Sequence, residues 1–80
     1  MRILLYGRLA EAIGPELQLD LPPGCSVGRL RQRLASDYPA AASSLTSGRA
    51  LTCVGGTLVR DDYVVEANEP VEFLPPLSGG

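Results

Sequence analysis

The sequence contains no histidine and no lysine, and these two absences exclude several classes of chemistry. Without histidine, neither a Ser/His/Asp nor a Cys/His catalytic set is possible, and histidine cannot bind a metal. Without lysine, no side-chain amine is available for a Schiff base, an isopeptide bond or acetylation. The seven basic residues are all arginine, and nine acidic residues bring the net charge to −2, which argues against binding to nucleic acid.

Long apolar runs and paired cysteine motifs are also missing. The apolar run after Arg2 ends at Gly7, which is too short for a secretory signal or for a membrane span of roughly 20 residues. Cys25 and Cys53 lie far apart and match no metal-binding or redox spacing. We therefore expect a cytoplasmic protein with free thiols, no membrane association and no bound metal.

Glycine and proline divide the 80 residues into short elements, as expected for one small domain. Continuous apolar residues in 1–6 predict a strand, and alternating leucines in 17–21 predict a half-exposed strand. Residues 9–13 predict one helical turn between them. The elements predicted beyond the main helix are a helical turn in 39–45 and strands in 50–54, 57–59 and 71–74.

The main helix is predicted to begin after Ser26, a favourable N-cap, and to end before Pro39. Its apolar stripe, at helical spacing, consists of Val27, Leu30, Leu34 and Tyr38. The polar residues off this stripe, which we expect in solvent, are Arg29, Arg31, Gln32 and Arg33.

The order of two strands, a helix and two or three further strands indicates an α+β fold of the β-grasp, or ubiquitin-like, architecture. In this fold a mixed sheet packs on one main helix. The first and last strands carry the densest apolar residues, so we expect them side by side and parallel at the sheet centre. The folded domain is expected to span residues 1–74, followed by an extended tail in 75–80.

Two turns contain residue types that also occur in functional sites, but both have simpler interpretations. Asp61-Asp62 is interpreted as a solvated turn, because aspartate favours turns. Gly55-Gly56 lacks the spacing, the following helix and the lysine of a phosphate loop, and is interpreted as a hairpin turn. No pair of carboxylates stands out in an apolar setting, so the candidate site is the end of the chain.

The last six residues form a thin carboxyl tail. Pro75 and Pro76 stop the strand because proline cannot donate to a ladder, and an extended tail reaches about 20 Å at ~3.3 Å per residue. Gly79 and Gly80 have no Cβ, so the end can pass through a narrow channel and approach another protein's active site. The tail therefore predicts delivery of its terminal carboxyl group into a partner's pocket.

The closing run Glu72-Phe73-Leu74-Pro75-Pro76-Leu77-Ser78-Gly79-Gly80 resembles the signature of the small subunits of molybdopterin synthase, within the ubiquitin-like sulfur-carrier family. The resemblance covers the whole chain in length and element order. Two turns depart from the family pattern, at Gly55-Gly56 and at Ala67-Asn68-Glu69. The resemblance implies a sulfur carrier whose Gly80 thiocarboxylate donates sulfur to a pyranopterin precursor in molybdenum cofactor biosynthesis.

The resemblance also implies the partners. An adenylyltransferase resembling ubiquitin-activating enzymes would use ATP to adenylylate Gly80, and a cysteine desulfurase or rhodanese would supply the sulfur. The tail would then enter the large subunit of molybdopterin synthase, within a heterotetramer. The chain itself would bind no cofactor stably and contribute no acid or base, which makes it the sulfur-donor subunit of a sulfurtransferase complex.

A docking surface follows from the same resemblance. It would be an apolar patch on the outer sheet face, beside the root of the tail. The residues expected to bind the partner are Tyr6, Leu58 and Leu74, continued by Pro75, Pro76, Leu77 and Ser78. A competing interpretation places some of the first three in the core, although a buried tyrosine needs a partner for its hydroxyl.

Three alternatives to this function stay open. The same thiocarboxylate could serve thiazole or cysteine synthesis, or the chain could be a protein modifier joined to target lysines through Gly80. A third alternative is a persulfide carrier at Cys25 or Cys53. We expect both cysteines to be buried and inert, because free cysteine is usually a small buried apolar residue.

Overall fold

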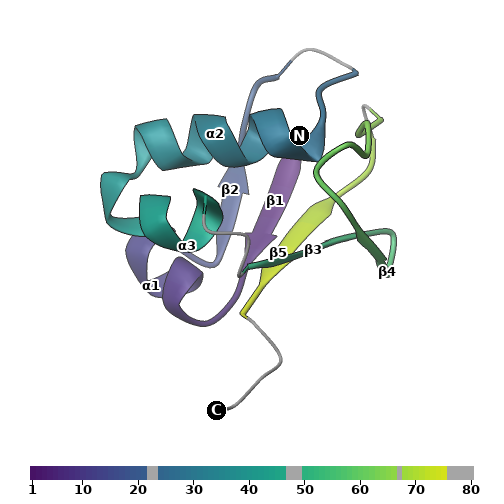
Figure 1. Cartoon of the computed structure of the whole chain (residues 1–80). Helices are drawn as coiled ribbons and strands as arrows, with labels where there is room; N and C mark the ends of the chain where they lie inside the picture. Colours follow the sequence, from purple (N-terminus) through teal and green to yellow (C-terminus); the bar gives the residue numbers. More distant parts are fainter. Residues whose placement is uncertain (22–23, 47–49, 67, 76–80) are drawn as a thin grey trace.

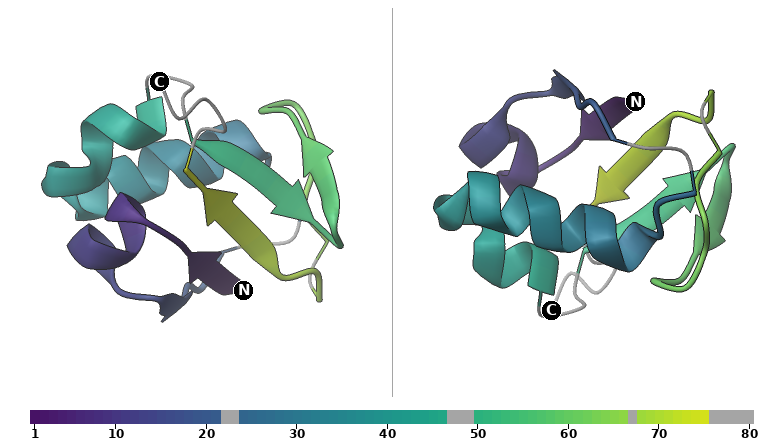
Figure 2. Two further views of the ribbon diagram at one scale, coloured as in Figure 1. Left: turned by 90° about the horizontal axis from the view of Figure 1, so that it is seen from below. Right: turned by 90° about the horizontal axis from the view of Figure 1, so that it is seen from above.

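A five-stranded sheet with helices on one side forms the structure (Figures 1 and 2). The parts of the chain that the computed structural model describes are residues 1–21, 24–46, 50–66 and 68–75. The strands are β1 (Arg2–Leu5), β2 (Glu16–Gln18), β3 (Leu51–Val54), β4 (Thr57–Val59) and β5 (Val71–Leu74). The helices are α1 (Arg8–Ile13), α2 (Val27–Asp37), the 3₁₀ turn η1 (Pro39–Ala41) and α3 (Ala42–Thr46). This is the predicted α+β arrangement, a mixed sheet packed on one main helix.

β1 and β5 lie side by side at the centre of the sheet and run parallel, as predicted. The strand order is β2-β1-β5-β3-β4, and β5 is antiparallel to β3 on its other side. Ile3 pairs with Val71 and Leu5 with Phe73, and all four side chains are buried in the core. Because β1 and β5 are parallel, their C-terminal ends lie at the same end of the sheet, where the chain leaves β5 (Figure 1).

α2 begins and ends where the sequence predicts. The Ser26 hydroxyl accepts a hydrogen bond from the Arg29 N–H at 3.2 Å, which caps the first turn. The helix ends at Tyr38, whose φ of −130° and ψ of 80° leave the helical region before Pro39. Figure 2 shows α2 lying across one face of the sheet. Of its predicted apolar stripe, Val27, Leu30 and Leu34 are buried, and Tyr38 at its end is half-buried.

The remaining elements differ from the predictions only in extent. β2 covers Glu16–Gln18 rather than 17–21, although Leu19 still donates its N–H to the Met1 carbonyl at 2.9 Å. Val64 makes an isolated bridge to Ser26 and belongs to no strand among the described residues. Three strands therefore follow α2 in the described chain.

Arg31 contradicts the expectation that the arginines of the main helix lie in solvent. Its side chain is 9% exposed, and its guanidinium donates to the carbonyls of Leu45 (3.0 Å) and Ala50 (2.6 Å) and to Thr52 Oγ1 (2.8 Å). Its Nε lies 2.9 Å from Asp61 Oδ1, close enough for an ion pair although the angle is not that of a hydrogen bond. Arg31 therefore ties α2 to the end of α3 and to the start of β3.

Gly7 has a backbone conformation, with φ 61° and ψ −136°, that residues with a Cβ rarely adopt. A Cβ at this position would also lie 3.3 Å from Pro75 Cγ. We therefore expect Gly7→Ala to lower the free energy of unfolding by about 1–3 kcal/mol, measured by urea denaturation. Gly28→Ala is the matched control, because its Cβ would make a similar contact, 3.4 Å from Asp61, but Gly28 lies in α2 without a positive φ. The comparison therefore isolates the cost of the backbone conformation at Gly7. Equal midpoints for the two variants would contradict the prediction.

Candidate functional site

The root of the tail, defined as Leu74 and Pro75, lies where β5 ends. The Tyr6 N–H donates to the Phe73 carbonyl at 3.2 Å, so the chain after β1 stays paired with β5 up to this point. Pro75 is exposed, and its ring lies beside Gly7. The other predicted tail residues, Pro76, Leu77, Ser78, Gly79 and Gly80, lie outside the described residues.

The outer face of the sheet, opposite the helices, carries the three apolar residues that the sequence predicts there. Tyr6 is 40% exposed, Leu58 is 56% exposed, and Leu74 is half-buried. Leu74 points outward because its neighbour Phe73 is buried and side chains alternate along a strand. None of the three is among the buried residues that form the described core, so the competing interpretation as core is wrong.

Two residues not predicted from the sequence extend this surface. Leu51 pairs with Leu74, and Cys53 pairs with Leu58, both in antiparallel register. Directly paired residues lie on the same face of a sheet. The outer apolar patch therefore consists of Tyr6, Leu51, Cys53, Leu58 and Leu74. Strand alternation in β3 could have indicated Leu51 and Cys53, since the residues between and after them, Thr52 and Val54, are buried.

A polar pair lies beside the patch. The Tyr6 hydroxyl donates a hydrogen bond of 2.8 Å to Glu72 Oε2. Glu72 is half-buried on the outer face, between Leu4 of β1 and Cys53 of β3 in the strand register. The hydrogen bond to Glu72 raises the pKa of Tyr6 above its usual 10.0, with smaller contributions from burial and from the charge of Glu72. The phenol therefore remains a neutral donor at physiological pH.

We expect Glu72→Gln to lower the pKa of Tyr6 toward 10.0, measured by ultraviolet titration against a Tyr6→Phe reference. Because the folded-state pKa is the higher one, this contact stabilises the fold below pH 10.0. Its contribution is lost as the pH rises through the folded-state pKa. Tyr63 is the internal control, since its pKa is raised by its own hydrogen bond to Glu69. A shift at Tyr63 with none at Tyr6 would contradict the assignment.

The two cysteines are less buried than predicted. Both are free and half-buried. Cys53 lies in the outer apolar patch, because its neighbours Thr52 and Val54 are buried and side chains alternate along a strand. Cys25 lies just before α2, beside a shallow hollow lined in part by Arg29 and Arg33. The expectation that both cysteines are buried is therefore wrong.

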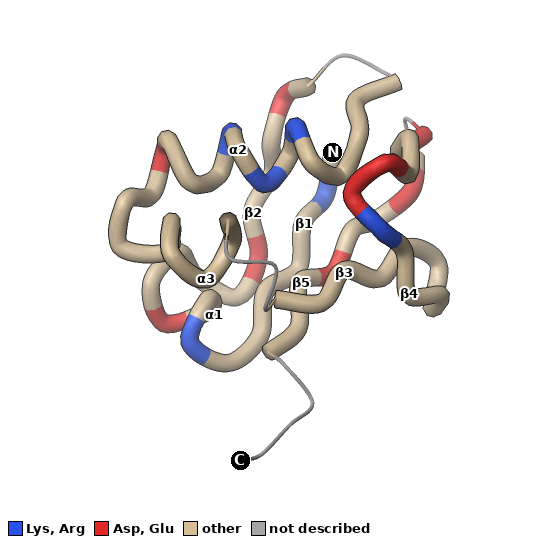
Figure 3. Tube along the Cα trace, in the orientation of Figure 1, with Lys and Arg blue, Asp and Glu red and all other residues tan. Residues whose placement is uncertain are grey.

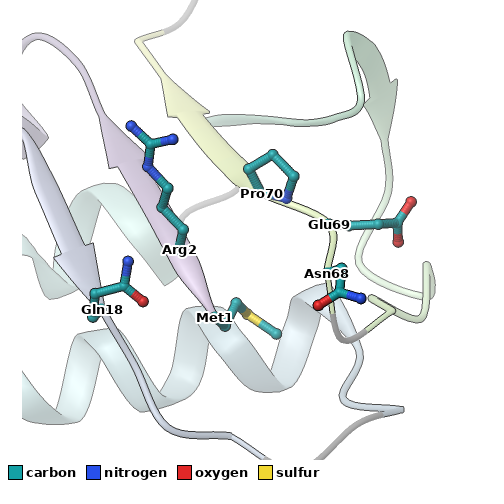
Figure 4. Close-up of a pocket in the computed structure, with 6 residues that line it drawn as sticks. All are labelled: Met1, Arg2, Gln18, Asn68, Glu69 and Pro70. Carbon is teal, nitrogen blue, oxygen red and sulfur yellow. The ribbon is translucent and has the colours of Figure 1, made fainter.

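Other surfaces offer no competing centre among the described residues. β3 and β4 contain no charged residue, as the tube in Figure 3 shows. A hollow of about 360 Å³ is lined in part by Met1, Arg2 and Pro70 (Figure 4). Pro70 precedes β5 and Pro75 follows it, so this hollow lies at the other end of the strand from Pro75. The Arg2 guanidinium there pairs with Glu16 at 3.1 Å. Within the described ranges, no cluster of acidic residues and cysteines could hold a metal, and no helix has the length and apolarity to cross a membrane.

Comparison with known proteins shows the family of the chain. Residues 3–80 match the ThiS family. The chain belongs to the ThiS family. It is also 31% identical over 83 aligned positions to the molybdopterin synthase sulfur carrier subunit of Escherichia coli, and the alignment spans 100% of this chain and 99% of that protein. The resemblance inferred from the closing run is therefore confirmed, and this ThiS-family chain is a homologue of that sulfur carrier.

Solved structures confirm the β-grasp fold of this ThiS-family chain. Small archaeal modifier protein 1 from Methanosarcina acetivorans has a TM-score of 0.80 at 25% identity, covering 99% of this chain and 94% of that one. The protein of the same name from Haloferax volcanii has a TM-score of 0.81 at 23% identity, covering 99% and 97%. A putative molybdopterin converting factor subunit 1 from Pyrococcus furiosus has a TM-score of 0.80 at 17% identity, covering 95% of each chain.

Proposed function

We propose that this chain is the sulfur carrier subunit of a molybdopterin synthase and that it carries sulfur as a thiocarboxylate on Gly80. The observation that supports this most is the full-length alignment with the sulfur carrier subunit of Escherichia coli. The geometry agrees with that role, because Pro75 is exposed and follows β5 directly, beside Leu74 of the outer apolar patch.

The chemistry follows from the weakness of a carboxylate as an electrophile. A partner adenylyltransferase uses ATP to convert the Gly80 carboxylate to an acyl-adenylate and releases pyrophosphate. The terminal sulfur of a donor persulfide then displaces AMP, and a thiol reduces the resulting S–S bond to leave the thiocarboxylate. The carrier supplies the acyl carbon and its positioning, while acids, bases and cations come from the partners.

The partners proposed here are the large subunit of molybdopterin synthase, the adenylyltransferase and a persulfide donor such as a cysteine desulfurase or rhodanese. ATP is a substrate of the adenylyltransferase, and the carrier needs no cofactor of its own. We place the protein in the cytoplasm, where free cysteines such as Cys25 and Cys53 persist. The large subunit receives the tail, and the pyranopterin precursor accepts its sulfur.

Mass spectrometry of the intact chain and of its C-terminal peptide tests the proposal. The chain is incubated with its cognate adenylyltransferase, ATP and a sulfur donor. We expect the Gly80 peptide to gain the mass that corresponds to replacement of one oxygen by sulfur. Sulfur on a peptide that contains Cys25 or Cys53, or no change with an active adenylyltransferase, would contradict the proposal.

A second candidate function is protein modification through Gly80. The likeness at 25% identity to small archaeal modifier protein 1 supports it. It predicts conjugates on lysines of other proteins that survive reducing denaturation. The chain has no lysine, so it cannot extend itself through side-chain amide bonds. Conjugates without thiocarboxylate would favour this candidate over the sulfur carrier.

A further inference from the structure

Glu72 is the only charged residue in β3, β4 and β5. The other neighbour of β5, β1, contains Arg2, whose guanidinium is paired with Glu16. It lies on the central strand, directly before Phe73 and two positions before Leu74. Its register partner on β3 is Cys53, a member of the outer apolar patch. β3 itself contains no charged residue. A partner that covers the patch and receives the tail must therefore also cover this carboxylate.

Glu72 has no cationic partner in the described part of the chain. The ion pairs found there join Arg2 to Glu16, Arg31 to Asp61 and Arg33 to Asp37. The only side chain that donates to Glu72 among the described residues is the neutral hydroxyl of Tyr6, at 2.8 Å on Oε2. In the free protein, water can solvate the rest of the carboxylate.

Docking of a partner on the outer apolar patch would remove water from the Glu72 carboxylate. Removing water from a carboxylate is costly unless a charge and hydrogen bonds replace it, and one neutral phenol offsets only part of that cost. Resting on the proposed function, we propose that the protein receiving the tail places an arginine or lysine against Glu72. In the same proposal, Tyr6 is a positioning residue that holds the carboxylate for this cation. The ion pair would lie next to Leu74 and so set the register in which the tail enters its channel.

Charge complementarity favours such a partner over a second copy of this chain. A symmetric face-to-face dimer of two outer apolar patches would enclose two Glu72 carboxylates in one interface, because Glu72 lies beside Cys53 of the patch. Like charges placed together at an interface disfavour that partner by several kcal/mol. The same residue that attracts a cationic partner therefore opposes self-association of the exposed patch.

A double-mutant cycle with the cognate large subunit tests the proposal. We expect Glu72→Gln to raise the dissociation constant about thirty-fold and to make binding less sensitive to salt, because the partner's cation is left buried without its charge pair. Tyr6→Phe keeps the ring but removes the donor, and is expected to raise the dissociation constant about threefold. In the Glu72→Gln background, Tyr6→Phe should have no further effect, since Tyr6 acts through Glu72.

The matched control is Asp20→Asn, which makes the same change in net charge. Asp20 is exposed and follows Leu19, which bonds to Met1 at the opposite edge of the sheet from Pro75. Unchanged binding and salt dependence for Glu72→Gln would overturn the proposal, as would an equal loss for Asp20→Asn. If the Gly80 peptide still gains sulfur in that case, the proposed function stands and only the ion pair is wrong. A wild-type chain that does not bind the large subunit would overturn both.

Discussion

Deleting Gly80 is expected to reduce sulfur transfer by at least about a hundred-fold while leaving the free energy of unfolding unchanged. The deletion shortens the reach of the terminal carboxyl by one residue, or ~3.3 Å, and a misplacement of about 1 Å can cost a hundred-fold in rate. The fold should not respond, because the last residue of the described core is Phe73. Thiocarboxylate formation and product release in the reconstituted synthase measure the first effect, and urea denaturation measures the second.

The control for this experiment is a substitution elsewhere in the chain that keeps the length of the tail. Asp62→Asn changes an exposed turn residue and is expected to leave both transfer and stability unchanged. If the Gly80 deletion supported full activity, the carrier chemistry would be excluded. If it lost activity and stability together, the tail would have a structural role that the described residues do not indicate.

Replacing Arg31 by alanine is expected to lower the free energy of unfolding by about 3 kcal/mol. The substitution leaves the carbonyls of Leu45 and Ala50 and the hydroxyl of Thr52 without their buried donor. It also removes the guanidinium that lies 5.6 Å from the ring centre of Phe73. The ion pair with Asp61 adds little to this total, since that carboxylate is 67% exposed. Urea denaturation at constant pH measures the loss.

Two further variants separate the sources of the Arg31 effect. Arg31→Met restores an apolar stem but not the donors, so it should recover only part of the loss. Arg29→Ala, on the exposed side of the same helix, should stay within about 0.5 kcal/mol of the wild type. Similar urea-denaturation midpoints for Arg31→Ala and Arg29→Ala would show that the buried hydrogen bonds of Arg31 contribute no net stability.

The β-grasp architecture was predictable because each element has its own local signal. Leucines at strand spacing, a capped helix with a clear apolar stripe, and Gly-Gly at the hairpin fix the order of elements without tertiary information. The dense apolar residues of the first and last strands were enough to predict their parallel pairing, and Ile3 opposite Val71 confirms it. The boundaries of β2 were less predictable, since alternation continues past the last residue of the strand.

The helical position of Arg31 indicated that its side chain is buried, whereas the charge of arginine favoured solvent exposure. Position 31 lies four residues after Val27 and three before Leu34, which places it on the apolar side of the helix. Arginine is rarely buried unless it is paired, and its acceptors belong to residues after the helix. Helical periodicity alone does not show that such acceptors converge, so solvent exposure was the more probable but wrong prediction.

Some features of the candidate site also had a local signal in the sequence, and others did not. The exposure of Tyr6 and Leu58 was expected, and strand alternation could also have indicated Leu51 and Cys53. The hydrogen bond between Tyr6 and Glu72 was not predictable, because 66 positions separate the two residues and only the parallel register of β1 and β5 brings them together. Contacts of this kind follow from topology and have no local sequence signal.

The strand that carries the tail is both the last described strand along the chain and the central strand of the sheet. β1 and β3 each need β5 as a neighbour, so the sheet cannot close before residues 71–74 have been synthesised. Pairing between such distant segments is typical of slow folding, and unpaired strand edges expose a nascent chain to aggregation. A prematurely terminated chain lacks both its central strand and its acyl terminus. Under the proposed function, the fold and the terminal carboxyl that would carry sulfur are therefore completed at the same stage of synthesis.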